Sequence, residues 1–178
     1  RNRGLVNHSE AATTLHGGTF IGRGGNAAYG IQNSSSATIE TIDVTALGEN
    51  SSNLNYGLYV GYGATATLRG GTFTGRGGSS TAGIYNGGFV DAKLEAENVV
   101  AVGENGSTYN RGVHNEHQTT LHGGTFIARA GNHAYGIYNN GAGANLKAAD
   151  IVASAEGGSV HTDGLCVAAT AEARADSS

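Results

Sequence analysis

The chain repeats its own sequence with a period of 53 residues. The hexapeptide Leu-x-Gly-Gly-Thr-Phe begins at Leu15 and recurs at Leu68 and Leu121. A second motif, Gly-Ile-Gln-Asn from Gly30, recurs at the same interval as Gly-Ile-Tyr-Asn. A fixed period of this length indicates a solenoid, in which each unit buries its apolar face only by stacking on its neighbours.

The composition excludes several other classes of protein. The 178 residues include 31 glycines and no proline, and only 13% are charged, which argues against coiled coils and helical bundles. The formal net charge of −4 gives no reason to expect nucleic acid as a partner. No apolar run approaches the roughly 20 residues that a membrane-spanning helix needs, so we expect no membrane insertion. The single cysteine, Cys166, permits no internal disulfide.

Each period divides into two related halves. The A half carries Leu-x-Gly-Gly-Thr-Phe, and the B half carries the segment around Ile39 and Asp43. In an A half, 11 residues separate Thr19 from Gly30, whereas 14 residues separate Asp43 from Gly57 when Asp43 is aligned with Thr19. This alignment predicts a loop three residues longer in every B half.

Short stretches alternate apolar and polar residues, as β-strands do. Stacking the halves gives three apolar columns, which predict three strands per coil. The first is Leu15, Ile39, Leu68, Leu94, Leu121 and Leu146. The second is Phe20, Val44, Phe73, Val99, Phe126 and Ile151. The third is Leu5, Ile31, Leu58, Ile84, Val113, Ile137 and Leu165.

These columns predict an all-β fold, a single right-handed parallel β-helix. It would have about six and a half coils of about 26 residues over residues 1–170, followed by a tail at 171–178. The pattern resembles pectate-lyase-like folds, phage tailspikes and autotransporter passengers. That resemblance is to an architecture that serves many functions, so function must be argued from sites.

One polar column runs beside the third apolar column. Stacked asparagine side chains can bond to one another and to the turn backbone, so we expect a structural ladder. N-glycosylation at the sequon-like Asn7 and Asn33 is the alternative interpretation. The ladder consists of Asn7, Asn33, Asn86, Asn115 and Asn139.

Two outward sets are candidates for binding or for subunit contact. An aromatic column, beside the asparagines, suits ring-on-ring stacking, contact with another subunit or a sugar ligand. The arginines recur on every second coil and suit either an acidic polymer or solvent. The candidates are Tyr59, Tyr85, His114, Tyr138, Arg23, Arg76 and Arg129.

No catalytic, cofactor or metal site is expected. The acidic residues do not form the close carboxylate pair that a glycosidase needs, and the histidines lack metal-ligand spacing. One outward column is expected to alternate threonine with Asp or Asn: Thr19, Asp43, Thr72, Asn98, Thr125 and Asp150. This alternation would break the flat threonine array that an ice-binding face requires.

The expected function is therefore structural. We expect an extracellular or cell-surface protein that stacks head to tail into a filament with copies of itself. The tail would supply a strand for the next subunit, with its small residues inward: Ala171, Ala173 and Ala175. The alternative is a segment of a larger adhesin or tailspike-like protein that binds polysaccharide.

Overall fold

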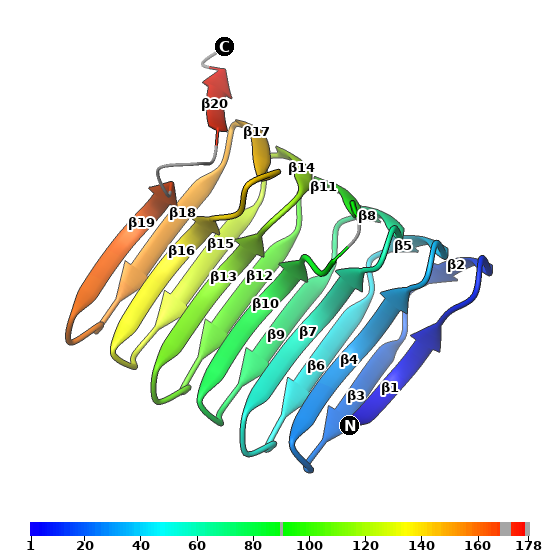
Figure 1. The fold of residues 1–178 in the computed structure, drawn as a ribbon, viewed down its shortest axis with the longest axis horizontal. Coiled ribbons are helices and arrows are strands. Elements are labelled where there is room, and N and C mark those ends of the chain that lie inside the picture. The colour runs from blue at the N-terminus through cyan, green and yellow to red at the C-terminus, as the bar shows by residue number, and fades with distance from the viewer. Residues whose placement is uncertain (90, 168–171, 177–178) are drawn as a thin grey trace.

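The computed structural model describes residues 1–89, 91–167 and 172–176, which form three parallel β-sheets wound into one solenoid (Figure 1). The strands run across the rod and stack along its long axis. Sheet 1 contains β1 (Asn2–Asn7), β4 (Ala27–Ser34), β7 (Leu54–Gly61), β10 (Ser80–Asn86), β13 (Tyr109–Asn115), β16 (His133–Asn139) and β19 (His161–Val167). Sheet 2 contains β2 (Ala12–His16), β5 (Thr38–Ile42), β8 (Thr65–Arg69), β11 (Lys93–Glu97), β14 (Gln118–His122), β17 (Asn145–Ala149) and β20 (Glu172–Asp176). Sheet 3 contains β3 (Thr19–Arg23), β6 (Thr45–Glu49), β9 (Thr72–Arg76), β12 (Val100–Glu104), β15 (Thr125–Arg129) and β18 (Val152–Glu156).

The predicted fold class is confirmed: the chain is all-β, with about six turns of a right-handed parallel solenoid and three strands per turn. The third predicted column is also confirmed on sheet 1. Leu5 pairs with Ile31, and the pairing continues coil by coil to Leu165. All members between these two ends are fully buried.

The first and second predicted columns are wrong in register by two residues. Phe20 pairs with Ala46, not with Val44, and Phe73 lies between Ala46 and Ala101. Sheet 2 shows the same shift, since Leu15 pairs with Thr41 while Ile39 pairs with Thr13. The core therefore alternates large residues of one half with small residues of the other, as interdigitated packing requires.

The misalignment is clearest at the corner between sheets 2 and 3, where Asp43 follows Ile42, the partner of His16. In an A half the two corner residues are glycines, Gly17 and Gly18, both with positive φ. In a B half the corner is Asp43, at a φ of 52°, followed by the buried Val44. Asp and Asn tolerate this left-handed conformation better than other non-glycine residues. Asp43 is thus equivalent to Gly17, not to Thr19.

The corrected alignment also shortens the predicted B-half loop. Thr45 is the true equivalent of Thr19, because the two residues pair in sheet 3. Thr45 lies 12 residues before Gly57, and Thr19 lies 11 residues before Gly30. The B-half loop is longer by one residue and not by three.

A column of glycines lets sheets 1 and 3 approach closely. A Cβ atom at Gly30 would lie 2.7 Å from the Gly57 carbonyl oxygen and would collide with the backbone nitrogen of Leu47 on sheet 3. No side chain fits there, which explains why every sheet 1 strand carries glycine at this position. The close contact keeps the two sheets at a fixed separation.

The β20 strand continues the solenoid beyond residue 170. Its backbone pairs with β17, with Ala173 opposite Leu146 and Ala175 opposite Ala148. Ala175 therefore falls in the column of Leu15, as predicted. Ala171 lies outside the described residues, and the docking role of the tail stays a prediction.

Candidate functional site on the outer face of sheet 1

Sheet 1 carries seven of the eight tyrosines of the chain. The predicted outward column is continuous in register, from Tyr59 through Tyr85 and His114 to Tyr138. A second aromatic column lies beside it and contains Tyr29, Tyr56 and Tyr135. Tyr59 faces outward by alternation from the buried Leu58. Tyr56 lies three residues before Tyr59, so the alternation is interrupted at Gly57, and both rings belong to a cluster apart from the main core.

The rings cover one another. Tyr59 and Tyr85 stack with centroids 5.4 Å apart, and Tyr56 and Tyr85 stack at 5.0 Å. Burial in this layer is the main cause that raises the pKa of Tyr56, Tyr59 and Tyr85 above their usual range. A sugar that stacks on aromatic faces would find the faces of the inner rings already occupied. Open ring surface is left mainly at the margin, where Tyr62 is 40% exposed.

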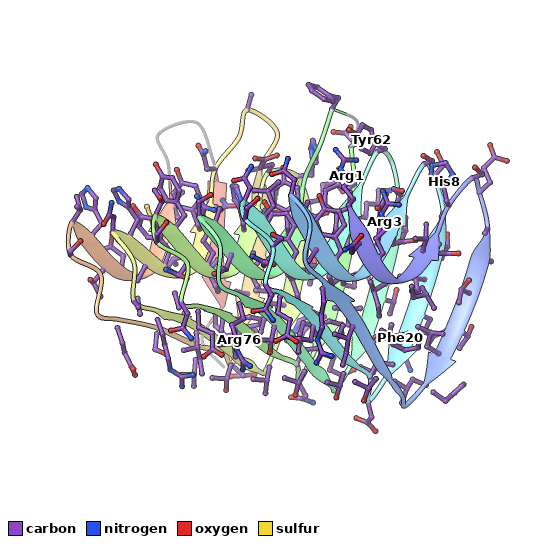
Figure 2. The ribbon with its side chains drawn as sticks, turned by 90° about the horizontal axis from the view of Figure 1, so that it is seen from below. Arg1, Arg3, His8, Phe20, Tyr62 and Arg76 are labelled. Atoms are coloured by element: carbon purple, nitrogen blue, oxygen red, sulfur yellow. The ribbon has the colours of Figure 1, made fainter. Side chains whose placement is uncertain are left out.

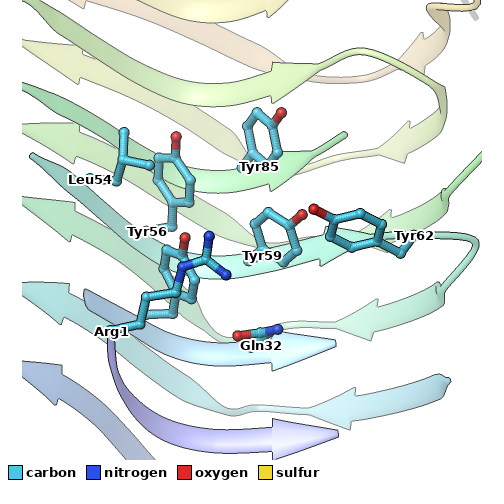
Figure 3. A pocket seen from close by; sticks show the side chains of 8 residues that line it. Arg1, Gln32, Leu54, Tyr56, Tyr59, Tyr62 and Tyr85 are labelled. Carbon is cyan, nitrogen blue, oxygen red and sulfur yellow. The ribbon is translucent and has the colours of Figure 1, made fainter. Parts of the chain in front are cut away.

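A pocket of about 180 Å³ opens at the N-terminal end of this aromatic layer (Figure 3). Its lining includes Arg1, Gln32, Tyr59 and Tyr62. Gln32 donates from Nε2 to Ser34 Oγ at 3.0 Å, whereas its buried Oε1 has no partner among the described residues. The pocket thus offers one cation and several aromatic edges.

A second pocket, of about 380 Å³, shares three of these lining residues and adds Arg3 and His8. Within the described structure, neither Arg1 nor Arg3 forms an ion pair with a carboxylate. This end of sheet 1 therefore concentrates positive charge on a protein whose net charge is −4. Such a surface suits an anionic ligand.

Arg111 is the buried cation of the same face. Only 7% of the residue is exposed, and its guanidinium lies 4.5 Å from the centre of the Tyr109 ring and 5.1 Å from that of Tyr138. Nη1 donates to Ser80 Oγ at 3.2 Å, and Nε has no partner among the described residues. Burial lowers the pKa of Arg111. Cation–π contacts take the place that a carboxylate would usually fill.

His114 is neutral in this layer. Burial, followed by the nearby charge of Arg111, holds the pKa of His114 well below its usual range. The Glu116 carboxylate lies 3.5 Å from its Nε2 but makes no hydrogen bond with it, and instead accepts one from the Tyr85 hydroxyl at 2.7 Å. The nearby Glu116 carboxylate does not offset the effect of burial on the pKa of His114.

The predicted arginine column lies on the opposite side of the solenoid, where Figure 2 shows Arg76 away from Arg1, Arg3 and Tyr62. Glutamates that the sequence analysis missed separate these arginines. Arg76 Nε lies 2.7 Å from Glu104 Oε1, and its Nη1 lies 3.9 Å from Glu49 Oε2. The full column on sheet 3 is Arg23, Glu49, Arg76, Glu104, Arg129 and Glu156.

This alternation makes a neutral ladder and not a basic groove. The correct alignment of A and B halves could have revealed this alternation from the sequence, since Gly22-Arg23 in one half aligns with Gly48-Glu49 in the next. With their charges compensated, Arg23, Arg76 and Arg129 offer little net attraction to an acidic polymer.

The asparagine column is buried inside sheet 1. Asn7 Nδ2 donates to Asn33 Oδ1 at 2.9 Å, and Asn86 Nδ2 donates to Asn115 Oδ1 at 3.0 Å. Asn115 in turn donates to Asn139 Oδ1 at 2.7 Å. These amides bond to one another and to turn carbonyls, so they hold successive coils together.

A second set of buried asparagines was missed. Asn55 donates to the Gly77 carbonyl at 2.8 Å, and Asn110 donates to the Ala130 carbonyl at 2.8 Å. Both stand two residues before the sheet 1 glycine of a B half, which is the spacing that could have identified them. They tie the long loops to the next coil.

Within the described ranges, no group of three or more His, Cys, Asp or Glu side chains is placed to hold a metal ion. The same part of the chain contains no helix that is long and apolar enough to span a membrane. Comparisons with protein-family models, with curated proteins and with solved structures gave no match to this chain.

Proposed function

We propose that this chain is a non-enzymatic extracellular structural protein that stacks head to tail into a β-solenoid filament. The observation that supports the proposal is the parallel backbone pairing that joins each coil to the next in all three sheets. The ion-pair column of sheet 3 accompanies this pairing, and asparagine bonds add to it on sheet 1 except where Val60 interrupts the column.

This contact is chemically self-complementary along the rod axis. Each edge of a coil carries both backbone donors and backbone acceptors, as in the bonds from Gly17 N to Ile42 O and from Thr38 N to Ala11 O. A coil of a second copy can therefore offer the groups that a neighbouring coil offers. A head-to-tail contact of this type does not close on itself and propagates as a fibre. The resemblance to tailspikes and autotransporter passengers supports placement outside the cell.

Sedimentation velocity and negative-stain electron microscopy over a range of protein concentrations test the proposal. We expect unbranched rods whose length grows with concentration. Deletion of 171–178 removes β20 and should shorten or abolish the rods while the β-sheet circular dichroism is retained. A matched control changes Lys147 to Ala, on the outer face of the neighbouring strand β17, and should assemble normally. Monomers at every concentration, or equal assembly of the deletion variant, would contradict the proposal.

Binding of an anionic polysaccharide by sheet 1 is a second candidate function. The specific observation in its favour is the pair of pockets, where neither Arg1 nor Arg3 has a carboxylate partner among the described residues. The carboxylates of an acidic sugar can bind guanidinium groups in bidentate geometry.

Titration with uronate-containing oligosaccharides, followed by intrinsic tyrosine fluorescence, tests this candidate. We expect saturable binding that weakens in the Arg3→Ala variant and in high salt. The control is Arg69→Ala, which removes an exposed arginine from sheet 2. Equal binding by both variants, or no binding by the wild type, would exclude the candidate without affecting the filament proposal.

A further inference from the structure

The corrected register produces a surface that the sequence alignment hid. On the outer face of sheet 3, two adjacent columns contain only hydroxyl-bearing and aliphatic side chains. The first column is Thr19, Thr45, Thr72, Val100, Thr125 and Val152. The second is Ile21, Leu47, Thr74, Val102, Ile127 and Ser154.

Asp43, Asn98 and Asp150, which were expected to interrupt the threonines, lie at corners instead. Each has a positive φ and stands at the turn between sheets 2 and 3. The first column is therefore threonine at four of its six positions and valine at the other two. The sequence-based objection to a regular threonine face no longer holds.

The two columns form a grid with nearly constant spacing. Neighbouring strands lie about 4.8 Å apart, and residues two positions apart along a strand lie about 6.6 Å apart. The underlying backbone is fixed by parallel pairing on both sides and by the close glycine contact with sheet 1. The side chains are mostly β-branched and so have few rotamers, which preorganises the surface before any ligand arrives.

The chemistry of the grid points to a hydrated partner. Among the described residues, none of the threonine and serine hydroxyls of these columns forms a hydrogen bond with the protein. A dry protein sheet packed on this face would bury those hydroxyls unpaired, at a cost of about 1–3 kcal/mol each. Ordered water can bond to the hydroxyls and form cages around the neighbouring methyl groups.

Exposure and charge distinguish this face from the other two. Ile21 and Val100 are each 36% exposed and Val152 is 57% exposed, whereas Val102 is nearly covered. No charged side chain interrupts the two columns, and the ion pairs of Arg76 and its neighbours form a border on one side only. The outer face of sheet 2, in contrast, carries charged side chains along its strands, such as Lys93 and Glu95 on β11.

A ligand that matches this surface must itself repeat in two dimensions and accept hydrogen bonds from hydroxyls. A crystal of water meets both conditions, because its oxygens form a regular lattice and accept hydrogen bonds. We propose that the outer face of sheet 3 binds ice. This binding is independent of filament assembly, because it uses a lateral face and not the coil ends.

Thermal hysteresis and the shape of single ice crystals, measured with the full-length protein, test the proposal. The wild type should separate the freezing and melting temperatures and produce faceted crystals. Thr72→Lys, which places a long charged chain in the middle of the grid, should lower the hysteresis several-fold. Thr67→Lys, which makes the same change on the outer face of sheet 2, should leave it unchanged.

Two further measurements separate the outcomes. Circular dichroism melts confirm that both variants are folded, and a conservative Thr72→Ser variant should retain part of the hysteresis. Absence of hysteresis and of faceting in the wild type overturns the proposal, as does an equal loss in both lysine variants. If Thr72→Lys instead changes the sedimentation coefficient and no hysteresis is found, the face is a contact between copies of the chain.

Discussion

Arginines on opposite faces of this solenoid are accommodated in two different ways. On sheet 3, Arg76 is half-exposed and lies between two glutamates of the neighbouring coils. On sheet 1, Arg111 is almost fully buried, contacts aromatic rings and has no carboxylate partner in the described structure. Arginine thus stabilises the fold through ion pairs on sheet 3 and through packing against aromatic rings on sheet 1.

The difference follows from what the two halves of the repeat supply. On sheet 3 the A halves place arginine and the B halves place glutamate in one column, so opposite charges meet at every step. On sheet 1 the neighbours of Arg111 in its column are Ala82 and Tyr135. The long arginine side chain reaches the strand of the small Ala82, where it donates to Ser80 Oγ. A repeat can therefore specify a ladder by alternating charge or by alternating size.

The largest loss of stability is expected when a charged residue is placed on the inward face of β9, whose outward face already carries a charge. Phe73 and Arg76 both lie on β9, with Phe73 fully buried in the core and Arg76 outward. Phe73→Asp should cost on the order of 5 kcal/mol or prevent folding, because it leaves a cavity and a buried charge without a partner. Arg76→Asp should leave a folded protein. Thermal melts followed by circular dichroism measure both, and similar midpoints would show that the inward and outward faces are assigned wrongly.

How far the sequence determined this fold is clearest at the corners of the solenoid. The repeat period, the three strands per coil and the column from Leu5 to Leu165 followed from sequence periodicity alone, because glycine marks the same position in every sheet 1 strand. The register between halves did not. Gly-Gly and Asp-Val form equivalent corners, and composition does not show that an aspartate and a glycine can share a left-handed conformation.

The misaligned register between the A and B halves had consequences for the candidate sites. It hid the glutamates that neutralise Arg23, Arg76 and Arg129, and it placed Asp43 inside a threonine column that is in fact free of charge. The aromatic and asparagine columns were unaffected, because they are measured from the sheet 1 glycine. The pockets could not be predicted, since they depend on where the long side chains of Arg1 and Tyr62 come to rest.

Removal of Arg111 should sharpen the comparison between the two faces. Arg111→Ala is expected to destabilise the protein by about 1–3 kcal/mol, through lost packing and lost cation–π contacts. Because no carboxylate partner is involved, raising the salt concentration should change this loss very little. Urea denaturation at low and high salt measures it. A loss that disappears in high salt would mean that Arg111 acts through long-range charge and not through packing.

His114 provides a pH test of the same buried layer. The folded protein keeps the ring neutral, whereas the unfolded chain binds a proton at a pH of about 6.5. The unfolded state therefore binds more protons below that pH, and stability should fall as the pH drops, by up to about 1.4 kcal/mol per pH unit. His114→Tyr, which copies Tyr85 and Tyr138 of the same column, should remove this part of the pH dependence.

Urea denaturation of both proteins between pH 7.5 and 5.5 measures the difference. The remaining histidines are shared by the two proteins, so their titration cancels in the comparison. The charged groups that face His114 are Arg111 and Glu116. Equal pH dependence of the two proteins would show that Glu116 compensates for burial and keeps the His114 proton.

The smallest loss of stability is expected when the ion pairs on the outer face of sheet 3 are removed. Arg76→Ala should cost at most about 1 kcal/mol, because exposed ion pairs gain little in water and lose side-chain entropy. The loss should shrink as salt rises, since screening weakens both the attraction that is removed and the repulsion left between Glu49 and Glu104. Glu104→Gln, which keeps the shape of its partner, should give a loss of similar size. Urea denaturation across a salt series compares these variants with Arg111→Ala. If Arg76→Ala proves more costly than Arg111→Ala and insensitive to salt, the stabilising contribution of arginine on this solenoid comes from the ladder and not from the aromatic layer.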